Sequence, residues 1–245
     1  LSLHDALPIF EFLQTIDSTN SELMRRAATG DCSTVCLVAK EQTAGRGRLG
    51  RAWLSDNHAL TFSIGLALAP LDWSGLSLVV GLSIAESLHE RIQIKWPNDL
   101  WVDGQKLAGI LIETTAIKHA ATNQRYAVIG VGINLEAPKA ATMQAALDAK
   151  VAPIGLRKLM PHATAESALQ LILQPLMDAI KHFEQHGWKP YAASFAKRDA
   201  LAGTSIKLSS GIAGLYAGVN EQGALMLKTD TGMQTIISHE VSVCR

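Results

Sequence analysis

Apolar residues in this chain gather in short continuous runs bounded by turn-forming residues, a pattern typical of buried strands in a globular protein. The runs cover residues 35–39, 60–68, 92–96 and 126–135. Two further runs, 100–102 and 106–113, flank Asp103-Gly104, a dipeptide that favours a two-residue hairpin turn. The pattern therefore predicts a sheet of buried strands that contains a hairpin near residue 103.

Three segments instead carry the signals of helices, and they cover residues 21–29, 76–92 and 163–186. The first follows Thr19-x-x-Glu22, the spelling of a capping box, and ends before Gly30. In the third we expect Pro175 to produce a kink. The stretch 137–152 is rich in alanine but has no clear amphipathic face, so it is expected to be a loop or a weak helix.

From residue 204 onward, short strand-like runs alternate with turn segments at 220–223 and 230–232, which indicates a small β-barrel. We place a domain boundary near residue 200, with an α+β domain over 16–200 and the barrel over 201–245. Residues 1–15 are expected to be an N-terminal edge of doubtful origin.

Composition narrows the classes of protein to which the chain can belong. Lysine plus arginine and aspartate plus glutamate both number 22, so no overall field steers the chain toward nucleic acid or an anionic membrane. The three cysteines, Cys32, Cys36 and Cys244, have no CxxC spacing, which argues against a disulfide framework or a structural zinc site and fits a reducing cytoplasm. No apolar run approaches the roughly 20 residues that span a bilayer.

Residues 45–50 satisfy the GxGxxG pattern, but a dinucleotide site requires a helix directly afterwards, and here a loop and a strand follow. The segment is therefore a flexible backbone that carries Arg46, Arg48 and Arg51, each able to bind a carboxylate or phosphate bidentately. A solvated turn and an RGG-like nucleic-acid patch are the alternatives. Patches of the second kind usually repeat within basic chains, unlike this one.

Two further segments project polar groups beside predicted strands. Residues 95–99, Lys-Trp-Pro-Asn-Asp, end a strand and place an amide and a carboxylate in a loop. Lys106 follows the hairpin turn as a point charge at the edge of the sheet. Each feature alone is equally typical of a plain turn or a surface lysine. His182 and His186 have a spacing that permits metal ligation, but no third ligand accompanies them, so a solvated helix face and no metal site are expected.

These segments occur in a fixed order, with Asp17-Ser18-Thr19-Asn20 before them and residues 130–134, Gly-Val-Gly-Ile-Asn, after them. In this order the chain resembles the biotin protein ligases, in the form that lacks an N-terminal DNA-binding domain, from residue 16 to the C-terminus. The resemblance implies a mixed-sheet catalytic domain of the class II synthetase-like biotin/lipoate ligase type and an SH3-like C-terminal barrel. The residues before Asp17 are too few for a helix-turn-helix domain.

The resemblance also implies a set of site residues. Biotin would contact Ser18, Thr19, Asn20, Gln42, Gly45, Arg46, Gly47, Arg48, Lys106, Gly109 and Gly130. ATP would contact Arg46, Arg48, Arg51, Trp53, Asn98, Lys106 and Asn134. Lys106 and Arg46 would stabilise the charge that develops on phosphate, and Asp99 would take the proton of the acceptor amine.

The implied activity is an ATP-dependent ligation in two steps. Biotin and Mg-ATP give biotinyl-5′-AMP and pyrophosphate, and a lysine of a biotin carboxyl carrier protein then displaces AMP. The implied cofactors are ATP and Mg²⁺, with biotin as substrate. We expect a cytoplasmic protein that binds neither nucleic acid nor a membrane. The sequence does not decide between a monomer and a homodimer. The alternatives are a lipoate-type protein ligase and a non-catalytic regulator that senses biotin or a nucleotide. Residues 137–155 contain no aromatic side chain to cover the adenine.

Overall fold

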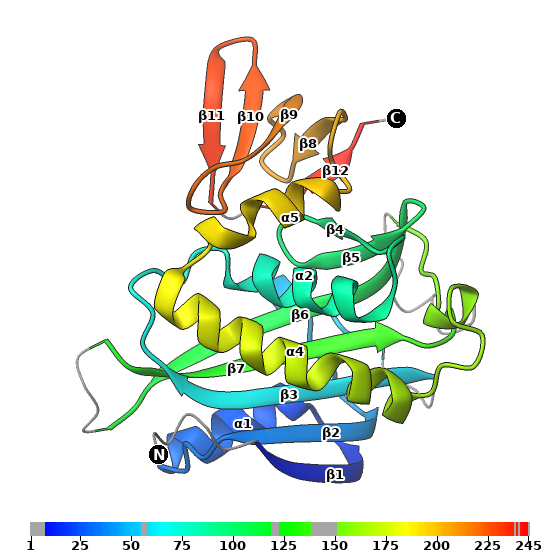
Figure 1. The fold of residues 1–245 in the computed structure, drawn as a ribbon, viewed down its shortest axis with the longest axis vertical. Coiled ribbons are helices and arrows are strands. Elements are labelled where there is room, and N and C mark those ends of the chain that lie inside the picture. The colour runs from blue at the N-terminus through cyan, green and yellow to red at the C-terminus, as the bar shows by residue number, and fades with distance from the viewer. Residues whose placement is uncertain are drawn as a thin grey trace. The chain divides into compact units, whose positions relative to one another are not determined.

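The computed structural model describes residues 8–54, 58–118, 123–138, 151–237, 239 and 241–244 (Figure 1). These residues divide into two compact units. The described residues of the first unit are 8–54, 58–70, 108–118, 123–138 and 155–166. Those of the second are 71–107, 151–154, 167–237, 239 and 241–244. The boundary predicted near residue 200 stays a prediction.

The first unit is built on a mixed sheet with the strand order β1-β2-β3-β7-β6. Its strands are β1 (Ile9–Ile16), β2 (Val35–Gln42), β3 (Ala59–Leu68), β7 (Arg125–Asn134) and β6 (Gln105–Ala116), of which β6 begins in the second unit. Strand β1 pairs with β2 in parallel, and the other neighbours are antiparallel. The apolar runs of β2, β3 and β7 are almost wholly buried, as their hydrophobic pattern predicts.

Strand β1 is absent from the prediction, because its apolar side chains do not form a buried run. Phe10 and Phe12 are 53% and 61% exposed on this edge strand. Nothing in such a segment resembles the continuous apolar stretch of a central strand.

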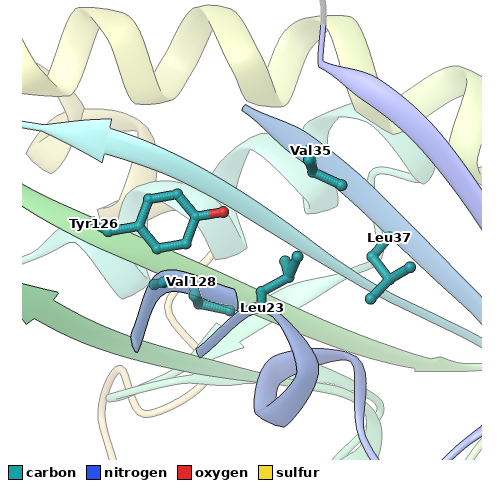
Figure 2. Close-up of a cluster of buried hydrophobic side chains, with 6 residues drawn as sticks. Leu23, Val35, Leu37, Tyr126 and Val128 are labelled. Carbon is teal, nitrogen blue, oxygen red and sulfur yellow. The ribbon is translucent and has the colours of Figure 1, made fainter. Parts of the chain in front are cut away.

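Helix α1 (Thr19–Ala28) packs against the sheet and closes a small core (Figure 2). Leu23 of the helix lies among Val35 and Leu37 of β2 and Tyr126 and Val128 of β7. Burial raises the pKa of the Tyr126 phenol, whose hydroxyl donates to the carbonyl of Ser33 at 3.0 Å. The core therefore fixes where the N-terminus of α1 stands on the sheet.

The predicted capping box at the start of α1 is displaced by one residue. Ser18 is the N-cap, and its hydroxyl accepts from the backbone N–H of Ser21 at 3.4 Å. Thr19 is thus the first helical residue, and Glu22 forms ion pairs with Arg25 and Arg26 rather than closing the cap. The Thr19 hydroxyl donates instead to the side chain of Gln42, which is distant in the sequence.

The second unit combines helices, a hairpin and a small sheet. Its helices are α2 (Leu76–Leu88), nearly all of α4 (Ala165–His186) and α5 (Ala192–Lys197), and the hairpin strands are β4 (Gln93–Lys95) and β5 (Asp99–Val102). Helix α2 ends four residues earlier than predicted, because His89 is extended, and α4 continues through Pro175. Asp103 and Gly104 have φ values of 50° and 75°, which confirms the predicted hairpin turn.

The C-terminal part of the second unit is a five-stranded antiparallel sheet with the order β11-β10-β9-β8-β12. The strands are β8 (Ser205–Leu208), β9 (Ala213–Val219), β10 (Leu225–Thr229), β11 (Gly232–Ile236) and β12 (Val241–Val243). Short 3₁₀ helices occur at Arg48–Gly50, Leu156–Lys158 and Lys189–Tyr191. Within the described ranges, no helix has the length and apolar character needed to cross a membrane.

Candidate functional site

A loop between β2 and β3 carries the three arginines, and we refer to residues 43–54 as the arginine loop. The backbone N–H of Trp53 donates to the carbonyl of Gly45 at 2.8 Å, and that of Gly47 donates to Arg51 at 2.7 Å. A Cβ at Gly45 would lie 2.5 Å from the Trp53 carbonyl oxygen, so only glycine permits this closure. The next described element is β3, and the helix that a dinucleotide fingerprint requires does not follow.

Polar side chains form a network beside the loop, at the start of α1. The Oε1 atom of Gln42 accepts from the backbone N–H of Thr19 at 2.8 Å and from its hydroxyl at 3.1 Å. The Ser63 hydroxyl lies 2.6 Å from both Thr19 Oγ1 and Asn20 Oδ1. Thr19, Asn20 and Ser63 are all buried, so these groups are held in one arrangement.

Glu113 joins this network to the arginine loop. Its Oε2 atom accepts from Asn20 Nδ2 at 2.9 Å and from Arg46 Nη2 at 2.6 Å. Asn20 Nδ2 also donates to the carbonyl of Leu111 at 3.2 Å. The Arg46 and Glu113 side chains are 43% and 25% exposed, so water screens their ion pair. Arg46 is thereby linked through Glu113 to Asn20, and the network continues from there to Thr19 and Gln42.

Ser63 and Glu113 contact the predicted site residues but are not among the residues predicted from the sequence. Both stand in predicted strands, Ser63 within the apolar run 60–68 and Glu113 at the end of the run 106–113. Ser63 could have been identified because it interrupts a buried run, where the hydrogen bonds of a polar residue must be satisfied inside the protein. Glu113 only ends its run and gives no such signal.

Two glycines of β7 allow side chains to approach the strand closely. A Cβ at Gly130 would lie 2.0 Å from Asn20 Oδ1, and one at Gly132 would lie 2.3 Å from the Trp53 ring. Gly109 of β6 is the partner of Gly132 across the sheet. Gly130 thus leaves room for the Asn20 side chain, and its predicted contact with biotin stays a prediction.

The other predicted site residues of the first unit differ in how deeply they are buried. Ser18 is buried and caps α1, and Asn134 is buried at the end of β7. Arg48 is partly buried, whereas Arg51 is exposed. The alanine-rich stretch 137–152, which is expected to be a loop or a weak helix, falls largely on residues 139–150, outside the described residues.

The second unit contains Asn98, Asp99 and Lys106. Lys106 Nζ lies 2.8 Å from Asp99 Oδ1, with side chains that are 33% and 15% exposed. The backbone of Lys106 is fixed independently, because its N–H donates to Ala152 at 2.9 Å and its carbonyl accepts from Ile154 at 3.0 Å. The structure therefore brings together the predicted catalytic lysine and carboxylate of this unit.

Metal ligation has little support among the groups that the structure describes. No cluster of three histidine, cysteine, aspartate or glutamate side chains occurs in these residues. His182 and His186 stack with ring centroids 4.3 Å apart, and His182 Nδ1 lies 3.0 Å from the Tyr191 hydroxyl.

The chain is similar to known proteins in sequence and in fold. A sequence profile of the Biotin/lipoate A/B protein ligase family matches residues 12–134. The bifunctional ligase/repressor BirA of Escherichia coli is 34% identical over 94% of this chain and 73% of that protein. The biotin--[acetyl-CoA-carboxylase] ligase of Paracoccus denitrificans is 31% identical over 94% and 98% of the two chains.

A solved structure is similar over nearly the whole chain. The biotin protein ligase from Aquifex aeolicus, in complex with biotin and ATP, has a TM-score of 0.77 and 29% identity over 97% of this chain and 99% of that one. The predicted fold class, a mixed sheet with helices and a small C-terminal β domain, is thereby confirmed.

Proposed function

The chain belongs to the biotin/lipoate A/B protein ligase family, and we propose from this premise how its own residues carry out the reaction. The activity is ATP-dependent biotin ligation. Biotin and ATP form biotinyl-5′-AMP and pyrophosphate, and the biotinyl group then passes to a lysine of a carboxyl carrier protein. The observation that carries the assignment of residues is the hydrogen-bonded network from Gln42 through Thr19 and Asn20 to Glu113 and Arg46.

The network supports a biotin pocket in the first unit. The head group of biotin is a urea, which has two N–H donors and one carbonyl acceptor but no charge. The buried hydroxyl of Thr19 and amide of Asn20, together with the partly buried amide of Gln42, match such a head group without a charge to desolvate. Ser18, Gly45, Gly47, Gly109 and Gly130 complete the proposed pocket.

We assign phosphate binding to Arg46, Arg48, Arg51 and Lys106. In the first step a biotin carboxylate oxygen attacks the α-phosphorus and pyrophosphate leaves, so negative charge increases on the phosphate oxygens. Cations fixed beforehand stabilise that charge, and a single such donor contributes about 3 kcal/mol to the transition state. Arg46 would exchange its screened contact with Glu113 for a bidentate contact with phosphate. Trp53, Asn98 and Asn134 would contact the remainder of the nucleotide.

We assign the proton transfer of the second step to Asp99. The amine of the carrier lysine attacks the carbonyl carbon of the mixed anhydride, the C–N bond forms, and AMP leaves with the electrons of the C–O bond. The attacking nitrogen must lose a proton, and a carboxylate can accept it. The 2.8 Å contact between Lys106 and Asp99 supports placing both groups at the reacting atoms.

Several finer points remain part of the proposal. Mg²⁺ would be bound by the oxygens of the triphosphate and would neutralise part of their charge. The protein would act in the cytoplasm and bind no nucleic acid, which a gel-shift assay tests by the expected absence of a specific complex. Light scattering distinguishes a monomer from a homodimer, which the sequence leaves open.

The first half-reaction tests the proposal through exchange of labelled pyrophosphate into ATP. We expect exchange that depends on biotin, and a decrease of about a hundredfold or more in Lys106→Ala. Lys228→Ala, which removes an exposed lysine of β10, is the matched control and should exchange normally. Exchange with lipoate but not with biotin would favour a lipoate ligase. Unaltered exchange in Lys106→Ala would remove that lysine from the mechanism.

A further inference from the structure

Trp96 connects the segment that carries Asn98 and Asp99 to the C-terminal sheet of the same unit. The indole is 2% exposed, and its Nε1 donates to the carbonyl of Gly223 at 3.0 Å. Gly223, with φ of 74°, closes the turn between β9 and β10. Asn220 Oδ1 holds that turn by accepting from the backbone N–H groups of residues 222 and 224, each at 2.9 Å. The indole is therefore bonded to a fixed acceptor.

Tyr216 supplies a second connection from the same sheet. Its hydroxyl donates to Asp199 Oδ2 at 2.5 Å, and Asp199 Oδ1 accepts from the backbone N–H of Leu201 at 2.9 Å. Asp199 and Tyr216 are 8% and 5% exposed, and burial raises the pKa of both groups. A buried carboxylate is costly unless its hydrogen bonds are satisfied, so this pair is sensitive to the loss of either partner.

The backbone around Asp199 is bound directly to β4. The Ile94 N–H donates to the carbonyl of Arg198 at 2.7 Å, and the Ala200 N–H donates to the carbonyl of Ile94 at 3.0 Å. Strand β4 leads through Trp96 into β5, where Asp99 is the pairing partner of Lys95. The C-terminal sheet thus holds the chain directly at Trp96 and, through Tyr216 and the segment around Asp199, at Ile94.

We propose that Tyr216 and Trp96 are positioning residues for the transfer step, which hold the Asp99 carboxylate in place through β4 and the turn that follows it. This inference rests on the role proposed for Asp99 and adds that the C-terminal sheet sets its position. Displacement of a reacting group by 1 Å can cost about a hundredfold in rate, so a partial shift is enough to slow transfer. Lys106 is held separately through residues 152–154 and should be affected less.

Tyr216→Phe is the test, because it removes one hydroxyl and leaves the ring. We expect transfer from preformed biotinyl-AMP to a carrier domain to slow about tenfold, with biotin-dependent pyrophosphate exchange within twofold of the wild type. Tyr191→Phe is the matched control, since the Tyr191 hydroxyl donates to the Ala179 carbonyl at 2.9 Å, on α4. It should leave both half-reactions unchanged.

Asp199→Asn separates positioning from simple loss of stability. Its amide can accept from the Leu201 N–H and donate to the Tyr216 oxygen, so we expect transfer close to the wild-type rate. Asp199→Ala should resemble Tyr216→Phe, and Trp96→Phe should slow transfer in the same way. Melting temperatures of all variants identify any that do not fold.

Three outcomes would overturn the inference in an active wild-type protein. They are equal transfer rates in Tyr216→Phe and Tyr191→Phe, loss of exchange and transfer in proportion, and loss of transfer in folded Asp199→Asn as large as in Asp199→Ala. A wild-type protein without biotin-dependent exchange would instead contradict the proposed function itself.

Discussion

Gly130→Ala tests whether the polar network at the start of α1 has the geometry described. The added Cβ would lie 2.0 Å from Asn20 Oδ1, closer than any real contact of that kind. The Asn20 side chain is held by hydrogen bonds to Ser63, Leu111 and Glu113, so it must break some of them to make room. Loss of one neutral hydrogen bond and one to a carboxylate costs about 3 kcal/mol. For a chain of this length, that lowers Tm by about 6–12 °C.

Thermal unfolding followed by circular dichroism measures this effect, and Asn20→Ala supplies the control. If the clash with the Asn20 side chain is the cause, the double variant Asn20→Ala/Gly130→Ala should be no less stable than Asn20→Ala alone. The reasoning is refuted if Gly130→Ala melts within about 1 °C of the wild type, or if the two single changes simply add in the double variant.

The remaining predictions concern the arginine loop, one cysteine and one surface carboxylate. Saturating biotin and ATP should suppress tryptic cleavage after Arg46 and Arg48, and persistent cleavage would contradict closure of the loop over the ligand. Burial raises the pKa of Cys36 to about 12, so iodoacetamide at pH 8 should modify the exposed C-terminal cysteine and leave Cys36 unmodified until the protein unfolds, which peptide mass spectrometry can follow. Hydrogen bonding to Arg25 lowers the pKa of Asp17 to about 2 from 3.8, so its contribution to stability is present above pH 3.8 and is lost as the pH falls toward 2. Asp17→Asn should therefore weaken the decrease of Tm over this interval, and an unchanged acid profile would argue against the ion pair.

Local pattern was sufficient where burial alone determines the structure. The run 60–68 is mainly apolar and becomes the central strand β3, and Asp103-Gly104 forms the hairpin turn that its backbone preferences favour. Strand β1 was not predicted because Phe10 and Phe12 remain exposed at the edge of the sheet. The hydrophobic pattern indicates which residues are buried on folding. An edge strand with exposed apolar side chains therefore shows this pattern only weakly.

The polar contacts of the site could not be predicted, because they depend on the register between distant strands. Ser63 faces Asn20 since β3 pairs with β7 so that Ser63 is opposite Gly130, where a missing side chain leaves room for the amide. Arg46 and Glu113 are 67 positions apart in the sequence, and no local feature of either segment indicates the other. Thr19 likewise leaves its expected capping role because Gln42 reaches it from β2. Sequence motifs predict which residues belong to the candidate site, whereas the fold determines how those residues contact one another.

The central claim is that this chain activates biotin with ATP and transfers it to a carrier lysine. Mass spectrometry of a biotin carboxyl carrier domain incubated with the protein, biotin and Mg-ATP tests it most directly. We expect one biotinyl group to be added to a single lysine of the carrier. This addition should depend on ATP and should be strongly reduced in Lys106→Ala. A carrier domain that stays unmodified, while a known biotin ligase modifies it under the same conditions, would contradict the account.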